Sequence, residues 1–212
     1  MSQGLSAGTG RPRNSQRGVR TGSRKRPGAA SRERGAARDA LLAAARAEFD
    51  QAGYEGTDSN RIARRAGYAP QTFYRHFKDK TAIFIEIYHR WFEEEFNDLR
   101  KAQGRGADEA ARVTLRHHAT HREFRRSLRR LTVADPDVRA ARAASRESQL
   151  ELVAAREAER GWKRGRTARI ALLLCTERIA DAAADGELND LGLSASEQVA
   201  LLADVIRHLG RG

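Results

Sequence analysis

Gln71, Tyr74 and Arg75 lie within five consecutive residues and could form directional hydrogen bonds with a flat, polar partner. A glutamine amide can bond an adenine edge through two atoms, and an arginine guanidinium can bond guanine in the same way. Tyr74, together with Pro70 at the leading end of the stretch, can contact thymine methyl groups or phosphates. These four side chains are therefore candidate base-reading residues.

The segment that positions these side chains is predicted as two short helices separated by a glycine. The first helix covers about 58–66, Gly67 breaks the chain, and the second helix begins two residues later. Phe73 and Phe77 are four residues apart and form the buried face of the second helix, so the candidate base-reading side chains point the opposite way. Helix, turn and helix within about 58–77 match the helix-turn-helix plan, whose second helix enters the major groove.

The net charge of +12 over 212 residues favours a polyanionic partner, and much of that charge lies in one segment. Residues 1–32 carry eight Arg or Lys and no acidic residue, and they are rich in Gly and Ser. Such a segment cannot bury enough apolar surface to offset its conformational entropy, so we predict a disordered basic arm over 1–32.

The remaining chain is predicted to be all-α, with about nine helices and no alternating strand pattern. Helices are expected at about 33–52, 80–101, 107–131 (as one or two), 136–160, 166–184 and 195–209. Asp79, Asp135 and the pair Ser194 and Glu197 supply capping side chains at three of their starts. We expect a three-helix DNA-binding domain at 33–79 and a helical effector-binding and dimerisation domain at 80–212.

The stretch from Leu41 to Tyr88 resembles the DNA-binding domain of the tetracycline-repressor (TetR) family. The resemblance rests on the run Ala-Gly-Tyr-Ala-Pro-Gln-Thr-Phe-Tyr-Arg-His-Phe-Lys-Asp-Lys at 66–80, and above all on its Thr-Phe-Tyr-x-His-Phe-x-x-Lys core. It covers about a quarter of the chain, and beyond that quarter only length, helix count and helix order agree. The resemblance implies a DNA-binding transcriptional regulator.

Carried over residue by residue, the base-reading positions of the family fall on Pro70, Gln71, Tyr74 and Arg75. Thr72, His76 and Lys80 also lie where the side and end of the second helix would meet the DNA backbone. Asn60 departs from the family, which often has arginine at that position. A DNA contact there therefore requires that the asparagine side chain take over the role of arginine. The phosphate-contacting positions that the resemblance implies are Ser59, Asn60, Thr72, His76 and Lys80.

The resemblance also implies a homodimer that reads a palindromic operator, with an effector bound in the C-terminal domain. Side chains chosen for size and expected direction give a candidate effector pocket of Trp91, Phe92, His121, Phe124, Leu128 and Leu150. The apolar stripes of the last two long helices must be buried somewhere, so they are the candidate dimer seam. That seam comprises Leu173, Ile179, Leu202, Val205, Ile206 and Leu209.

The remaining groups that could do chemistry, a histidine pair, an arginine cluster and the cysteine, are interpreted as structural. Histidines at 117 and 121 are one helical turn apart and could share a metal ion, but a partly buried polar face is the more common reason for such a pair. The arginines at 122–130 either hold an anionic effector or, as we predict, form a solvated face. Cys175 follows a run of leucines and is predicted to be buried. We therefore predict no metal and no cofactor.

No Gly-rich phosphate loop, nucleophile elbow or paired acidic motif is present in the sequence, so an enzyme is not expected. The single cysteine fits a reducing compartment, and we expect a cytoplasmic protein with no membrane segment. The predicted function is a repressor released from its operator by a small molecule. The alternative is a sequence-tolerant DNA-coating protein driven by the basic arm. The sequence does not name the operator, the effector or the regulated genes.

Overall fold

The computed structural model describes residues 27–159 and 161–208, and these residues form ten helices and no strand. The helices are α1 Pro27–Ala52, α2 Ser59–Arg65, α3 Pro70–Tyr74, α4 Lys80–Lys101, α5 Ala107–Thr120, α6 Arg122–Ala134, α7 Pro136–Glu159, α8 Arg166–Asp185, α9 Glu187–Asp190 and α10 Ala195–His208. The all-α prediction is confirmed, with one helix more than expected: the four-residue α9 begins directly after Gly186, whose φ of 90° ends α8.

Helix α1 begins at Pro27, so the prediction that the arm stays disordered to residue 32 is wrong at its C-terminal end. Proline is well suited to the first turn of a helix because its missing N–H would have no helical partner there. The alanines that follow extend the helix through residues that show no apolar periodicity. The remainder of the predicted arm, 1–26, lies outside the described residues.

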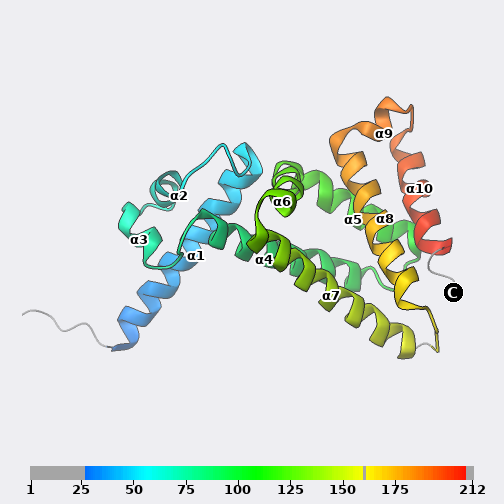
Figure 1. The fold of residues 1–212 in the computed structure, drawn as a ribbon, viewed down its shortest axis with the longest axis horizontal. Helices are drawn as coiled ribbons and strands as arrows, with labels where there is room; N and C mark the ends of the chain where they lie inside the picture. The colour runs from blue at the N-terminus through cyan, green and yellow to red at the C-terminus, as the bar shows by residue number, and fades with distance from the viewer. Residues whose placement is uncertain (1–26, 160, 209–212) are drawn as a thin grey trace, which may run out of the picture.

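The molecule is elongated, with α1, α2 and α3 at one end and α8, α9 and α10 at the other (Figure 1). Helices α4 and α7 run between the two ends. None of the helices in the described part of the chain is both long and apolar enough to cross a lipid bilayer.

One apolar core joins the first three helices to the body of the protein. Leu41 and Phe49 of α1, Phe73 of α3, Phe84 of α4 and Phe124 of α6 are all buried in it. The Phe84 and Phe124 rings stack with centroids 4.7 Å apart, which connects the helix-turn-helix end to the body without a polar gap. A second, smaller core lies between α5, α8 and α10.

The three predicted caps are present as hydrogen bonds, and Asp58 supplies a fourth. The carboxylates of Asp58 and Asp79 accept from the amides of Arg61 and Ala82, both at 2.8 Å, and so begin α2 and α4. Asp135 accepts from two amides at the start of α7. Ser194 and Glu197 form the reciprocal capping box before α10, with the Ser194 amide donating to Glu197 at 2.8 Å.

Candidate nucleic-acid interface

Helix α3 is a single short turn that presents three exposed side chains. Pro70 begins it without a side-chain cap, and Phe73 lies fully buried beneath it. The helix ends at Tyr74, earlier than expected, but Arg75 keeps helical dihedral angles of −75° and −19°. Gln71, Tyr74 and Arg75 are therefore all exposed on the side away from the core, as the sequence predicts.

A hydrogen bond between the two helices of the motif fixes the tyrosine. The Ser59 Oγ and the Tyr74 hydroxyl are 2.7 Å apart, so a predicted phosphate-contacting side chain holds a predicted base-reading one. Asn60, on the first turn of α2, is exposed beside them. Tyr74 itself is 57% exposed, and its ring packs edge-on against Phe73. The tyrosine is thus oriented before any partner binds.

Glu48 of α1 holds α2 in place from inside the domain. It is 3% exposed, and its carboxylate accepts hydrogen bonds from Thr57 at 3.0 Å and from Arg65 at 2.9 Å. Arg61 also pairs with it, with Nε 2.6 Å from a carboxylate oxygen. Burial raises the pKa of Glu48, but these donors more than offset it, so the pKa is lowered and the carboxylate stays charged.

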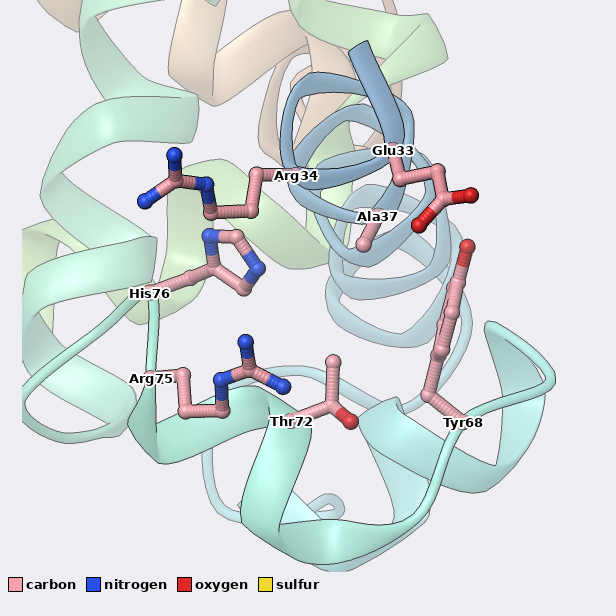
Figure 2. A pocket seen from close by; sticks show the side chains of 7 residues that line it. All are labelled: Glu33, Arg34, Ala37, Tyr68, Thr72, Arg75 and His76. Carbon is pink, nitrogen blue, oxygen red and sulfur yellow. The ribbon is translucent and has the colours of Figure 1, made fainter. Parts of the chain in front are cut away.

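A basic groove of about 490 Å³ lies between the start of α1 and the turn after α3. Figure 2 shows Arg34 of α1 beside His76, with the Arg75 guanidinium and Thr72 facing the same space. Burial, together with the positive charges of Arg75, Arg38 and Arg34, lowers the pKa of His76. Although the Glu33 carboxylate also lines the groove, a phosphate beside Arg34, Arg75 and His76 would relieve this repulsion between like charges, so that side of the groove suits a DNA backbone.

Lys80 is more enclosed than expected for a side chain that is free to contact a DNA phosphate. Its Nζ donates to the carbonyl oxygens of Tyr54 at 2.6 Å and Thr57 at 2.9 Å, and it lies 3.9 Å from the centroid of the Tyr54 ring. Two of its three donors are therefore used in holding the α1–α2 turn. Burial lowers the pKa of Lys80, which agrees with this enclosed position.

Only two of the six residues predicted for the effector pocket border a common cavity. Trp91 and Phe92 border a cavity of about 40 Å³ between α4, α5, α7 and α8, which holds a few water molecules at most. Phe124 and Leu128 belong instead to the apolar core, because α6 packs against α1 and the Phe124 ring stacks on Phe84 of α4. They do not line the cavity, and that part of the prediction is wrong.

The other two predicted pocket residues also lie elsewhere. His121 is paired with Asp50 of α1, with Nδ1 3.1 Å from the nearer carboxylate oxygen, and Leu150 is buried on α7 without bordering the cavity. The polar side chains that the sequence prediction missed, and that do border the cavity, include Glu95, Thr114, His118, Gln149, Thr176 and Glu177. The sequence signal that could have identified them is the occurrence of polar residues at buried positions of otherwise apolar helix faces.

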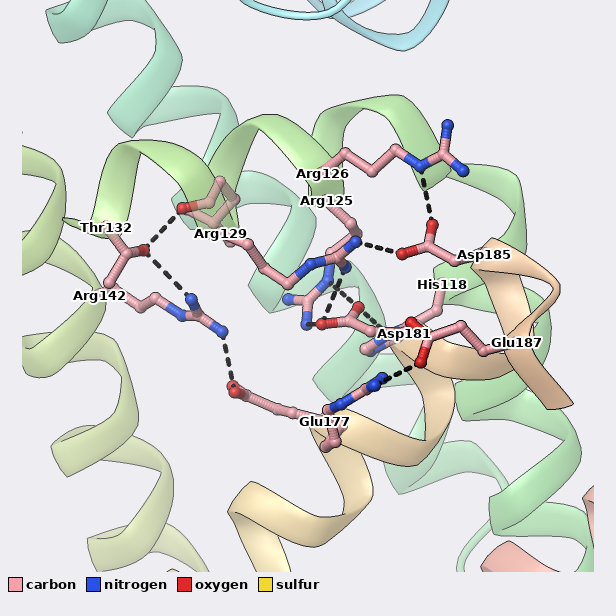
Figure 3. Close-up of polar contacts among 12 residues, drawn as sticks. His118, Arg125, Arg126, Arg129, Thr132, Arg142, Glu177, Asp181, Asp185 and Glu187 are labelled. Atoms are coloured by element: carbon pink, nitrogen blue, oxygen red, sulfur yellow. Dashed lines mark hydrogen bonds and ion pairs between the residues drawn. The ribbon is translucent and has the colours of Figure 1, made fainter. Parts of the chain in front are cut away.

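A buried network of charges lies beside this cavity (Figure 3). Arg125 is 2% exposed and donates to both oxygens of Asp181, at 3.0 and 3.1 Å, while His118 Nδ1 lies 2.9 Å from the same carboxylate. Arg126 and Arg129 pair with Asp185. The prediction that the arginines at 122–130 form a solvated face is wrong for Arg125, because α8 lies against α6 and covers it with Asp181, whereas Arg122 and Arg130 are exposed as predicted.

The predicted dimer seam contains residues that the chain buries within itself. Leu202 is 0% exposed in the core between α5, α8 and α10, and Ile179 and Ile206 pack around it, so Leu202 cannot contact a second copy. Leu173 borders the small cavity. Val205 is partly exposed, and Leu209 lies outside the described residues.

Other apolar side chains of the same two helices are exposed. Leu174 on α8 is 44% exposed and Leu201 on α10 is 36% exposed. Cys175 is exposed next to Leu174, so the prediction of a buried thiol is wrong. The buried residues of α8 are Ala180, Asp181 and Ala182, near its C-terminal end, whereas Cys175 lies in the less covered middle of the helix.

Comparison with known proteins agrees with this geometry. The sequence model of bacterial regulatory proteins of the tetR family matches residues 41–87, and no curated protein matches the chain. A Rhodococcus protein described as a TetR-family transcriptional regulator is 18% identical over 82% of this chain and 98% of its own, with a TM-score of 0.65.

Two further solved structures share the fold. GusR of Salmonella enterica is 20% identical over 82% of this chain and 95% of its own, with a TM-score of 0.63. The fatty acid degradation regulator FadR of Bacillus halodurans is 16% identical over 81% and 93%, with a TM-score of 0.59. At these identities the likeness shows a common fold, and the named activities are those of the other proteins.

Proposed function

Because this chain belongs to the TetR family and is a DNA-binding transcriptional regulator, we propose that it is a homodimeric repressor that a small effector releases from a palindromic operator. One observation carries the proposal. Gln71, Tyr74 and Arg75 stand outward from a helix that buried phenylalanines anchor, directly beside a basic groove. A dimer would place two such helices about 34 Å apart, in successive major grooves.

We propose that side chains of α3 read bases and that residues around them hold phosphates. Pro70, Gln71, Tyr74 and Arg75 are assigned to base edges. Ser59, Asn60, Thr72 and His76 are assigned to the backbone, with Thr72 and His76 acting from the basic groove. Lys80 contributes through its one remaining donor and through the turn it holds.

Replacing Gln71 by alanine is expected to weaken binding to the selected operator about tenfold to a hundredfold, because a bidentate base contact contributes about 1–3 kcal/mol. The duplex is first selected by the protein from a random pool, and affinity is then measured by fluorescence anisotropy at fixed salt. Gln103→Ala, an exposed glutamine in the α4–α5 connection, is the matched control and should bind normally. Equal affinities for Gln71→Ala and wild type would refute the assigned role.

The proposed effector site is the cavity beside Trp91. Its lining combines aromatic rings with the polar groups of Gln149, Thr176 and Glu177, so once widened beyond its present volume of about 40 Å³ it would suit a small ligand that has both apolar and polar parts. The indole Nε1 of Trp91 is buried without a hydrogen-bond partner, and such a donor costs free energy until an acceptor reaches it. An effector oxygen would supply that acceptor.

Helix α4 offers a physical route from this cavity to the DNA. Trp91 borders the cavity, while Ile83 and Phe84, two turns earlier on the same helix, lie in the core under α1 and α3. Widening the cavity would move α4 and with it the support of α3. Effector and operator must then weaken each other by the same factor.

Filling the cavity with Thr176→Leu is expected to leave operator affinity within about threefold of wild type and to reduce effector release at least about tenfold, because leucine adds a volume close to that of the cavity. Release is measured as loss of anisotropy when metabolites are screened against the protein–operator complex. Thr167→Leu, at an exposed position of the same helix, is the matched control and should still be released. Normal release of Thr176→Leu would place the effector elsewhere.

The proposed dimer seam is the exposed apolar side of α8 and α10, with Leu174, Leu201 and the partly exposed Val205. Helices α8 and α10 lie at the end of the molecule opposite α3 (Figure 1). Two copies joined there would leave both α3 helices accessible.

A further inference from the structure

Three potential metal ligands from separate parts of the chain meet at the junction between the helix-turn-helix end and the body. Glu94 lies on α4, His117 on α5, and His121 between α5 and α6. One ligand atom from each, all within 4.8 Å of one another, could be directed at a common point. The two histidines alone led to no metal prediction from the sequence, because the carboxylate comes from a helix that is distant in the chain.

His121 is already oriented as a metal ligand would be. Its Nδ1 lies 3.1 and 3.2 Å from the two carboxylate oxygens of Asp50, so this nitrogen carries the proton and donates it. The tautomer leaves Nε2 as an acceptor. A carboxylate that holds one ring nitrogen while the other faces an ion is the usual arrangement behind a metal-binding histidine.

A protein cation occupies the space between Glu94 and His121. The Arg46 guanidinium donates to both Glu94 oxygens at 2.6 Å, and its NH2 group lies 3.2 Å from His121 Nε2. This contact is the one expected if Nε2 is an acceptor. The Arg46 side chain is 34% exposed, so it can rotate into solvent without unfolding α1.

His117 completes the group from the other side. Its ring centroid is 5.2 Å from that of His121, and its Nδ1 is buried without a hydrogen-bond partner. Buried ring nitrogens usually have a partner, so a nitrogen without one beside two other potential ligands calls for an explanation.

We propose that Glu94, His117 and His121 bind one divalent transition-metal ion of the zinc class, and that Arg46 leaves when the ion enters. Two nitrogens and one carboxylate oxygen are a ligand set that zinc accepts, with water in the fourth position. Ligand atoms about 2.1 Å from one ion lie about 3.4 Å apart in a tetrahedron. Side-chain rotations that move each ligand atom by about an ångström would therefore close the site. Asp50 remains the group that orients His121.

The experiment uses the full-length chain without an affinity tag. Isothermal titration with ZnCl₂ should give one ion per chain with a Kd that is about micromolar or lower. Co²⁺ should give visible absorption bands typical of a tetrahedral site. Glu94→Gln should weaken Zn²⁺ binding at least about tenfold, whereas Glu93→Gln, its exposed neighbour, should not.

Arg46→Ala separates a metal site from an ordinary ion-pair cluster. Because the guanidinium competes with the ion, its removal should tighten Zn²⁺ binding about tenfold, while Arg90→Ala, which removes an equal charge elsewhere, should leave the Kd unchanged. Circular dichroism checks that each variant is folded. The proposal is overturned by absent binding, by unchanged Zn²⁺ affinity in Glu94→Gln, or by unchanged or weaker binding in Arg46→Ala.

Discussion

Replacing Asp181 by asparagine is expected to lower the free energy of unfolding by about 3–5 kcal/mol, because it leaves Arg125 buried without its hydrogen-bonded carboxylate. Arg125 is 2% exposed and cannot relieve the cost by losing a proton. In the wild type both oxygens of Asp181 accept from it, at 3.0 and 3.1 Å. Urea denaturation followed by circular dichroism measures the change.

Two companion variants test the cause of this loss. Asp204→Asn removes a largely exposed aspartate on α10 and should change stability by less than about 0.5 kcal/mol. The double variant with Asp181→Asn and Arg125→Met should recover part of the lost stability, since no unpaired charge then remains buried. If Asp181→Asn were within about 1 kcal/mol of wild type, the network would not contribute as described.

The same carboxylate gives the protein a pH dependence with a defined sign. Burial raises the pKa of Asp181, but the hydrogen bond from His118 and the charge and hydrogen bonds of Arg125 outweigh it, so its folded-state pKa lies well below the ordinary value. A lowered folded-state pKa contributes stability that is fully present above the ordinary range of aspartate. That contribution is lost as the pH falls below about 4, and this part of the acid dependence should be missing in Asp181→Asn.

Replacing Phe73 by alanine is expected to cost about 3–5 kcal/mol and to abolish operator binding. Helix α3 has five residues, which is far too few for a stable isolated helix, so its shape depends on the buried ring. Phe73 is 0% exposed, and its centroid lies 5.7 Å from that of Phe77. Denaturation midpoints and anisotropy with the selected duplex measure the two effects together.

Tyr74→Ala is the matched control, since it removes the neighbouring ring on the exposed side of the same helix. Its stability should stay within about 1 kcal/mol of wild type, while operator affinity should fall about tenfold to a hundredfold. A Phe73→Ala variant that bound the operator normally would show that α3 does not need its buried anchor. Normal operator binding by Tyr74→Ala would instead remove the tyrosine from the interface.

Local features of the structure were predictable from sequence neighbours alone. Asp58, Asp79 and Asp135 each cap the helix that begins at the next residue by accepting from an amide three residues later, and the chemistry of such a cap is complete within one turn. The outward direction of Gln71 followed in the same way from two phenylalanines at helical spacing. Even here the end of α3 was missed, because the tight turn into α4 depends on packing.

Features that depend on a distant partner were not predictable in this way. Lys80 was assigned to phosphate, but carbonyl groups 23 and 26 residues earlier accept two of its donors. Arg125 was assigned to a solvated face, but its carboxylate is 56 residues away. Leu202 was assigned to the dimer seam, but α5 covers it within the same chain.

The amino-acid order alone determined the helical class, the helix-turn-helix and the exposed side of its second helix, because hydrogen bonds and apolar spacing within a few turns specify them. Tertiary structure alone decided which charges are buried, which leucines remain accessible and which groups join Glu94. The reason is that a side chain's solvation depends on what packs over it, and here the covering helices are far away in the chain.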